Sequence, residues 1–137
     1  MTPATEDYIK TVYYLEKNSR NNKVTTSSIA ERLNVKDSSV SAMIKKLAKN
    51  KLIKYESRRG VKLTKHGKDN ALKIIRKHRL LEIFLNENLC YKPEEVHTEA
   101  DKLEHYVSDE VMKNIENLLG ERDFGVHGEK IPRLNDV

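Results

Sequence analysis

The protein has 137 residues, of which 37% are hydrophobic, and this predicts one domain or two small domains around a limited core. Its net charge of +5 is unevenly divided: residues 1–65 hold 15 Lys+Arg against 6 Asp+Glu, a net of +9, and residues 66–137 hold 11 against 15, a net of −4. A single cysteine, no apolar run of membrane-spanning length and no secretion-signal pattern exclude disulfide-stabilised, transmembrane and secreted proteins, so we expect a soluble cytoplasmic one.

The spacing of apolar residues predicts three helices in the first part of the chain. The first lies near residues 5–18 and is followed by the polar turn "NSRNNK". A short helix then begins at a cap formed by Thr26 or Ser27. After the three-residue turn "NVK", Asp37 or Ser38 caps a second helix. Its inner face carries four apolar side chains: Val40, Met43, Ile44 and Leu47.

The pattern changes in the middle of the chain. Residues 52–64 alternate apolar and polar side chains around "SRRG", which predicts a small hairpin with arginines at its tip. Thr64 then caps a long helix over 65–88. Pro93 suits the first turn of another helix that continues to about residue 107. A last helix over 109–119 follows a serine cap, and the tail after it has no clear period.

Short helix, turn, second helix and basic hairpin is the order of a winged helix-turn-helix domain. One helix fits the DNA major groove, where short polar side chains approach base edges and lysines and arginines contact phosphates. The alternative is a helical hairpin with a solvated, lysine-rich face, but the net charge of +9 favours DNA binding. We predict that residues 1–65 bind DNA through these side chains: Ser38, Ser39, Ser41, Lys45, Lys46, Lys49, Arg58 and Arg59.

The stretch "HTEADKLEH" (97–105) gathers histidines and acids on one predicted helix. At roughly 100° per residue, four of them fall within one arc beside an apolar stripe, and Glu99 falls on the opposite side. The stripe consists of Val96, Ala100, Leu103 and Val107. An ordinary polar helix face is the alternative to a metal site. The four candidate metal ligands are His97, Asp101, Glu104 and His105.

Other predicted helices add further candidate ligands. His78 and Glu82 are four residues apart and share a helix face, a spacing found both in metal sites and in plain stabilising pairs. Asp7 lies on the first helix, and His127 in the tail is an open candidate. Carboxylates and imidazoles without a thiolate suit Mn²⁺ or Fe²⁺, although zinc or copper would compete by affinity.

The chain resembles the diphtheria toxin repressor family of metal-dependent repressors, and is closest in character to its manganese-responsive regulators. The resemblance is carried by "EDYIKTVYYLE", "SSIAERLNVKDSSVSAMIKKL", "GVKLTKHG", "IIRKHRLLEIFL", "EVHTEADKLEHYVSDEV" and "HGEKIP". It implies a mainly α fold in two parts. A winged helix-turn-helix domain occupies 1–65, and an all-helical metal-binding and dimerisation domain with an irregular tail occupies 66–137.

The same resemblance implies two metal sites and a homodimer that binds palindromic operators upstream of metal-uptake genes. One site would use Asp7, Asp101, Glu104 and His105. The other would use His78, Glu82 and His97, with a remaining ligand from the tail, a water or a missing domain.

Three positions and one segment depart from the family pattern. Iron-responsive members carry Met and Cys where this chain has Asp7 and Asp101, and the added carboxylates favour Mn²⁺. Short manganese regulators have a glutamate at the position of Lys10, and a lysine cannot bind a metal ion while it is charged, so their paired-ion arrangement is not expected here. Longer members also carry a C-terminal SH3-like domain.

Two other classes of function are weighed against the metal sensor. A winged-helix repressor could respond to a small organic effector, with its carboxylates binding metal only incidentally. A metallohydrolase would need a general base and a substrate cleft, and the sequence has no HExxH, no nucleophile motif and no glycine-rich phosphate loop. We therefore expect no enzymatic activity.

Overall fold

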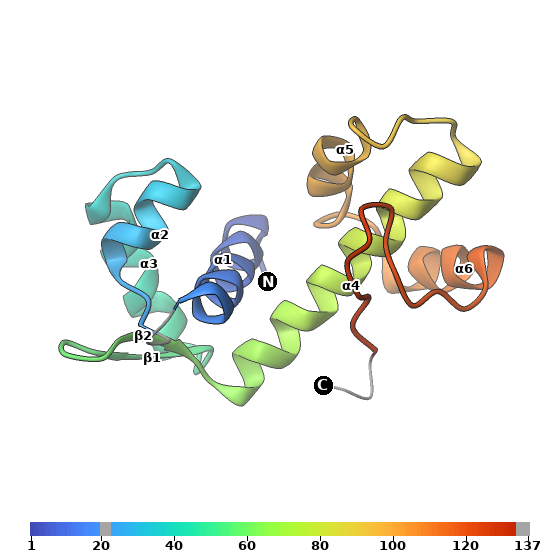
Figure 1. Ribbon diagram of the computed structural model, residues 1–137. Coiled ribbons are helices and arrows are strands. Elements are labelled where there is room, and N and C mark those ends of the chain that lie inside the picture. The colour runs from blue at the N-terminus through green and yellow to red at the C-terminus, as the bar shows by residue number, and fades with distance from the viewer. Residues whose placement is uncertain (20–22, 134–137) are drawn as a thin grey trace. The chain divides into compact units, whose positions relative to one another are not determined.

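The computed structural model describes residues 1–19 and 23–133. The chain forms two compact units, Met1–Ala71 and Leu72–Val137. The first contains α1 (Pro3–Asn18), α2 (Thr26–Leu33), α3 (Asp37–Lys49) and the strands β1 (Ile53–Glu56) and β2 (Gly60–Leu63), shown in Figure 1. The structure confirms the predicted fold class, which is mainly helical with one small hairpin.

Local capping explains where the helix-turn-helix begins and turns. The N-cap of α2 is Thr25, not the predicted Thr26 or Ser27, because Thr25 and Ser28 exchange side-chain and backbone hydrogen bonds of 3.0 Å in a capping box. Asn34 ends α2 in the left-handed conformation, which turns the chain sharply toward α3. The N-cap of α3 is Lys36, and it makes no side-chain hydrogen bond.

The predicted alternation of buried and exposed residues is confirmed along α3. Val40, Ile44 and Leu47 are buried, Met43 is half-buried, and the serines and lysines of the opposite face are exposed. The polar turn before α2 lies partly outside the described residues, but its ends meet where Lys23 N–H donates to Ser19 Oγ at 3.1 Å.

The hairpin is an antiparallel pair with Tyr55 opposite Val61 and Ile53 opposite Leu63. Gly60 begins β2 with a φ of +78°, and a Cβ there would lie 2.3 Å from the carbonyl oxygen of Val24. The tight approach lets Val61 N–H donate to that same oxygen at 2.7 Å. The arginines at the tip of this hairpin, which we call the wing (residues 53–63), are exposed.

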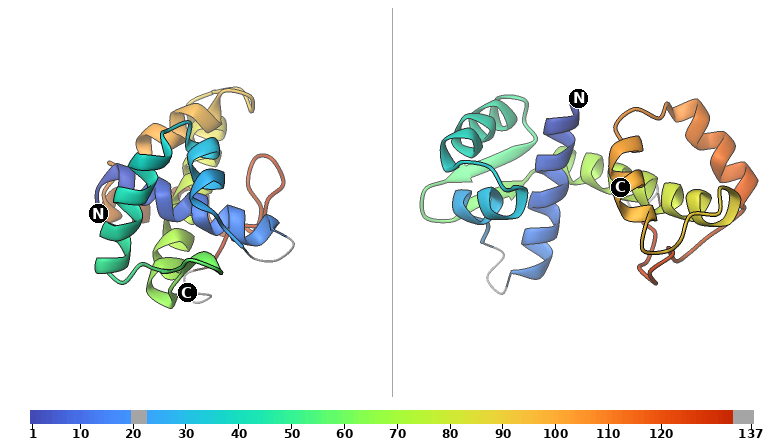
Figure 2. Two further views of the ribbon diagram at one scale, coloured as in Figure 1. Left: turned by 90° about the vertical axis from the view of Figure 1, so that its left-hand side faces the viewer. Right: turned by 90° about the horizontal axis from the view of Figure 1, so that it is seen from above.

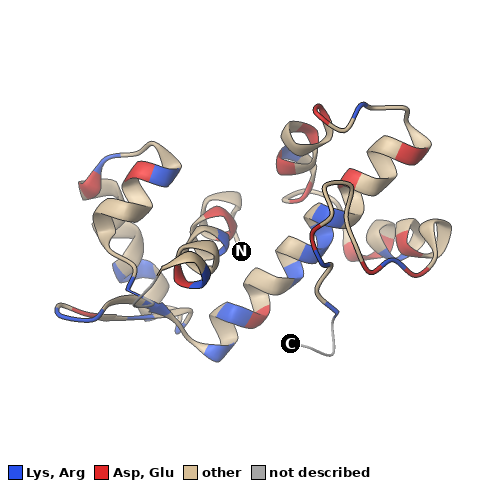
Figure 3. Ribbon diagram, viewed as in Figure 1, with Lys and Arg blue, Asp and Glu red and all other residues tan. Residues whose placement is uncertain are grey.

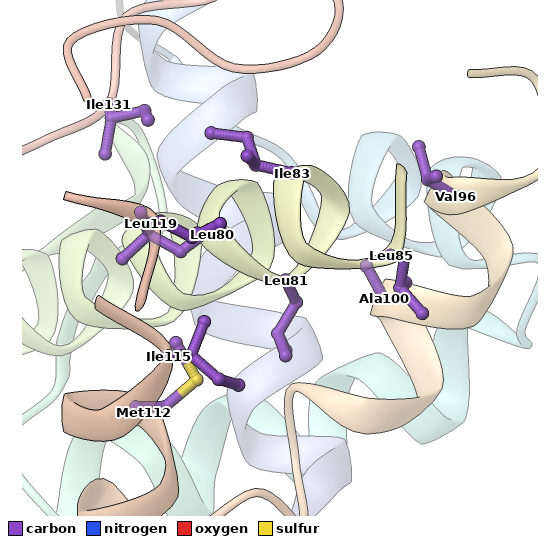
Figure 4. Close-up of a cluster of buried hydrophobic side chains, with 10 residues drawn as sticks. All are labelled: Leu80, Leu81, Ile83, Leu85, Val96, Ala100, Met112, Ile115, Leu119 and Ile131. Atoms are coloured by element: carbon purple, nitrogen blue, oxygen red, sulfur yellow. The ribbon is translucent and has the colours of Figure 1, made fainter. Parts of the chain in front are cut away.

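The helix α4 (Lys65–Asn88) begins in the first unit and continues into the second. The predicted Thr64 cap is present, since its Oγ1 accepts from Gly67 N–H at 3.0 Å. Figure 2 shows α5 (Val96–Leu103), α6 (Asp109–Leu119) and the tail around the C-terminal part of α4. Their shared core is the cluster in Figure 4: Leu80, Leu81, Ile83, Leu85, Val96, Ala100, Met112, Ile115, Leu119 and Ile131.

Two expectations for the second unit were wrong. The helix α5 is shorter than predicted: a turn occupies 93–95 before it, and the last helical residue is Leu103 instead of about 107. Leu103 was placed in the apolar stripe but is 37% exposed, whereas Glu104 is fully buried. The α5 residues that face the core are Val96 and Ala100, one turn apart, and Glu104 follows one turn later just beyond the helix.

The tail has structure that its sequence pattern did not reveal. Phe124 and Lys130 form an isolated antiparallel bridge, and Gly125 N–H donates to the Glu129 carbonyl at 2.7 Å. Ile131 anchors this hairpin-like loop in the core. Among the described residues, no helix combines the length and apolar composition needed to cross a membrane.

Candidate functional site

His78 and Glu82 lie one turn apart on the inner side of α4. His78 is 7% exposed and Glu82 is 2% exposed, and His78 Nε2 lies 3.3 Å from Glu82 Oε1. Because an ionisable side chain loses hydration when it is buried, it needs a compensating partner. The apolar residues Leu80 and Leu81, between them, and Ile83, after them, are buried too, so this turn of α4 packs in the core.

The other nitrogen of His78 faces α5. His78 Nδ1 lies 2.6 Å from Glu104 Oε1 and 3.3 Å from Asp101 Oδ1. The second oxygen of Asp101 lies 3.3 Å from His97 Nε2, so one carboxylate bridges two imidazoles. The two imidazole rings meet edge to face with centroids 5.0 Å apart. Ligand atoms of His78, His97 and Asp101 all lie within 4.8 Å of one another, close enough to share one ion.

The charges around His78 decide its protonation. Burial by itself lowers the pKa of His78, but hydrogen bonds to Glu104 and Glu82 and the negative charges of these two carboxylates raise it to about 9. His78 is therefore an imidazolium at neutral pH, and both of its N–H groups point at carboxylates.

A second group of ligand atoms joins α4 to the tail. His127 Nδ1 lies 3.5 Å from Glu82 Oε2 and 3.6 Å from Glu129 Oε1, and His127 Nε2 lies 2.9 Å from the Pro93 carbonyl oxygen. Glu82 Oε2 and Glu129 Oε2 are buried without a hydrogen-bond partner among the described residues. Two orphaned carboxylate oxygens beside an imidazole are a donor set that a hard divalent cation would satisfy. The site residues therefore fit a metal ion.

The tail is fastened to α4 by two arginines. Arg76 Nη1 donates to the Pro132 carbonyl at 2.9 Å, and Arg79 donates to the Lys130 carbonyl. These bonds and the buried Ile131 hold His127 and Glu129 against Glu82. Sequence reasoning missed Glu129 altogether. The available signal was "HGE", which sets two ligands two residues apart around a glycine turn.

The structure thus brings five of the predicted metal ligands together in the second unit: His78, Glu82, His97, Asp101 and Glu104. The two predicted sets are not separate there, because Asp101 and Glu104 both contact His78. His105 is half-buried near the end of α5. Asp7 is half-buried on α1 in the first unit, and its grouping with the α5 residues stays a prediction.

The predicted DNA-contacting side chains form an exposed, basic surface in the first unit. Ser38, Ser39 and Ser41 lie in the first turns of α3, and Lys45, Lys46 and Lys49 follow along it. Figure 3 shows basic residues on α3 and the wing, whereas acids predominate around α5 and α6. A cationic surface with short polar side chains at the start of one helix has the chemistry of a DNA-reading face.

Comparison with known proteins agrees with this division of roles. Residues 1–61 match the family model of the iron dependent repressor N-terminal DNA binding domain, and residues 64–133 match its metal binding and dimerisation domain.

An HTH-type transcriptional regulator of Methanocaldococcus jannaschii is 37% identical over 120 residues, which are 87% of this chain and 94% of that protein. The diphtheria toxin repressor of Corynebacterium jeikeium is 32% identical over 137 residues, which are 100% of this chain and 56% of that protein.

A solved manganese-dependent transcriptional repressor in complex with manganese superposes with a TM-score of 0.87 and 40% identity. The superposition covers 96% of this chain and 59% of the manganese repressor, so this chain spans little more than half of some relatives. The buried imidazole–carboxylate cluster and the basic helix-turn-helix with its wing agree with both family models. The chain therefore belongs to the iron-dependent repressor family of metal-dependent transcriptional regulators.

Proposed function

We propose that the protein represses genes for metal-ion uptake by binding operator DNA when a divalent metal ion is present. The observation that carries this proposal is the buried group of His78, Glu82 and Glu104. Three ionisable side chains in one core are costly to stability, and apolar residues of similar volume would be cheaper. Their presence in the core supports a role in binding, and the family supports metal as the ligand.

The donor set supports Mn²⁺ or Fe²⁺ as the ion. We assign Asp7, Asp101, Glu104 and His105 to one ion, and His78, Glu82 and His97 to a second. In addition, His127 and Glu129 are proposed as ligands from the tail. A bound divalent cation would supply positive charge at the point where these carboxylates and imidazoles converge. All proposed ligand atoms are oxygens and nitrogens, which hard or borderline cations prefer.

His78 explains how the protein keeps this group folded before the ion arrives. Its imidazolium donates from Nδ1 to Glu104 and from Nε2 to Glu82, so a proton occupies the positions that a cation would use. A histidine binds a metal ion only in its neutral form, so binding an ion through His78 would require the imidazolium to release one proton to solvent. We propose that proton release and ligand gathering are one step in sensing.

We propose that Asp7 couples this step to DNA binding. It lies on α1, whose buried residues Tyr8, Ile9 and Val12 pack in the core of the DNA-binding unit. If Asp7 binds an ion that residues of the second unit also bind, the DNA-binding unit can adopt fewer orientations relative to the second unit. The coupling must then act in both directions, and operator DNA should tighten metal binding by the same factor.

On the DNA, we propose that the α3 serines approach base edges in the major groove. The α3 lysines and the wing residues Arg58 and Arg59 would contact phosphates, which position the protein without reading sequence. We propose a homodimer on a palindromic operator, because the matched family domain is a dimerisation domain. Exposed apolar residues on α6, Val111 and Leu118, are the candidate dimer contact, and sedimentation of a Val111→Glu/Leu118→Glu variant should reveal monomers.

The test is operator affinity at fixed ionic strength with no metal, Mn²⁺, anaerobic Fe²⁺ or Zn²⁺. We expect a strong increase with Mn²⁺ or Fe²⁺ that a chelator reverses. Equal affinity with and without metal would contradict the proposal. If an organic compound instead releases the protein from DNA regardless of metal, the function is that of a small-molecule-responsive winged-helix repressor.

A further inference from the structure

Among the described residues, the backbone pairing on the outer edge of β2 is a single antiparallel bridge between Val24 and Val61. In an antiparallel pair, successive N–H groups point alternately toward and away from the partner strand. Val61 N–H points away from β1, because it donates to Val24 O at 2.7 Å. Leu63, two residues later, must point its N–H to the same outer side.

A side chain from α1 accepts that second hydrogen bond. Glu16 Oε1 accepts from Leu63 N–H at 2.7 Å, although the two residues are 47 positions apart in the chain. The carboxylate therefore does for Leu63 what a neighbouring strand would do. A short hydrogen bond to an ionised acceptor is among the stronger kinds in proteins.

The surroundings of Glu16 indicate a built contact. Glu16 is half-buried and lines a cavity of about 300 Å³ with Tyr13, Lys17, Lys62 and Lys68. Burial raises the pKa of the Glu16 carboxyl, while the Leu63 hydrogen bond and the charges of Lys62 and Lys68 oppose that rise. The chain thus places an acid where burial disfavours its charge, and surrounds it with groups that favour the charge.

The wing needs such a contact to hold a defined position. A two-stranded hairpin with four residues in each strand is marginally stable by itself. Its outer edge is held at Val24, next to the turn before α2, and at Glu16, near the end of α1. The Glu16 contact is made at Leu63, the last residue of β2, two residues before α4 begins.

We propose that Glu16 is a positioning residue that fixes the wing to α1 and so holds Arg58 and Arg59 in place for DNA. This inference rests on the proposed DNA-binding function. It goes further by assigning one of the two contacts that hold the outer edge of the wing to a side chain of α1. Asp7 is also on α1, so a movement of α1 caused by metal binding at Asp7 would reach the wing through the Glu16–Leu63 hydrogen bond.

The test compares operator affinities of the metal-loaded full chain for Glu16→Gln, Glu16→Ala and Glu16→Asp. Gln keeps an acceptor at the same reach, and Ala removes it with the same change of charge. Asp keeps the charge but is one methylene too short. We expect Glu16→Gln, which keeps a neutral acceptor, to bind more tightly than the other two variants, and these two to bind about 3- to 10-fold more weakly than the parent protein, the value of one lost hydrogen bond.

A second arm separates wing positioning from general stability. The same substitutions are made in a chain that already carries Arg58→Ala and Arg59→Ala. If Glu16 acts through the wing, the Glu16→Gln and Glu16→Ala variants should have nearly equal operator affinity in this background, because the arginine contacts that Glu16 positions are absent. Faster hydrogen exchange of the Leu63 amide in Glu16→Asp, but not in Glu16→Gln, would support the same conclusion.

Three results would overturn the inference. They are equal affinity of Glu16→Gln and Glu16→Ala, parent-like affinity of Glu16→Asp, or an unchanged Gln–Ala difference without the wing arginines. Should Glu16→Ala fail to fold, the Asp variant still decides the question. If the parent protein shows no metal-dependent operator binding, the proposed function fails instead, and Leu63 exchange still reports whether Glu16 holds the wing.

Discussion

The two units of this protein use charged residues in opposite ways. In the first unit, Lys45, Lys46 and Lys49 stand exposed on α3. In the second, His78, Glu82 and Glu104 are buried and contact one another. Exposed lysines can bind the phosphates of DNA, which stay largely hydrated. Buried carboxylates and imidazoles have lost their hydration, and a small bound cation would compensate for that loss. Burial, more than the sign of the net charge, separates the two roles.

The largest expected effect comes from breaking the buried cluster. Glu104→Gln removes the charge that lies 2.6 Å from His78 Nδ1. We expect the affinity for Mn²⁺ to fall by at least about 100-fold, since even partners outside the ligand shell contribute 10- to 100-fold. Calorimetric titration with Mn²⁺ measures it. Glu99→Gln, on the adjoining helix α5 and paired with Lys102, is the matched control, and an equal loss in both variants would contradict the assignment.

The next largest effect should come from the exposed charge of the wing. Arg58→Ala with Arg59→Ala should weaken operator binding roughly 10- to 30-fold at physiological salt. The slope of log affinity against log salt concentration should become less steep by about 2, because about two phosphate contacts are lost. Metal affinity in the absence of DNA should not change. Lys113→Ala, an exposed cation on α6, controls for net charge. If it weakens binding as much, the effect is non-specific and the wing has no special role.

A smaller effect is expected from the tail ligands. His127→Ala with Glu129→Gln should lower the affinity of one class of bound Mn²⁺ by about 10-fold, because the group around Glu82 loses two of its three members. Competition with a metal-binding dye would resolve the two classes. Glu121→Gln, exposed in the same tail, should leave both classes unchanged. If Mn²⁺ titrations are identical for all variants, His127 and Glu129 are not metal ligands.

The smallest effect concerns pH. As pH rises, the stability of the metal-free protein should fall, whereas the affinity for metal should rise. His78 has a pKa of about 9 in the folded protein against 6.5 as its ordinary value. Its contribution to metal-free stability is therefore complete below about pH 6.5 and is lost as pH rises through 9. Metal binding needs neutral His78, so metal affinity should rise over that range.

Melting temperatures measured with chelator and with Mn²⁺ from pH 6 to 9 test this opposition. With chelator the melting temperature should fall as pH rises, and the gain on adding Mn²⁺ should grow. His78→Gln should remove most of both trends. Parallel curves for the metal-free and metal-loaded protein would show that the His78 proton and the ion do not compete.

The sequence by itself determined the order of the elements, because their signals are local. Apolar spacing indicated α1 and α3, and alternation around Gly60 indicated the wing. The serine cap at Ser108 indicated where α6 begins. The charge division and the ligand types were also visible without coordinates. Exact caps were less predictable, since Thr25 is preferred to Thr26 only because its box partner is Ser28.

Only the tertiary structure decided which distant residues meet. No local pattern indicates that Asp101 bridges two imidazoles, that Glu129 reaches Glu82 and His127, or that Glu16 accepts from Leu63. Leu103 was expected in the apolar stripe but is exposed, and Glu104 is buried because it follows Val96 and Ala100 at four-residue spacing on the face that packs in the core. Helix periodicity assigns faces within one element, whereas the pairing of faces depends on how the cores pack, and that information is spread over the whole chain.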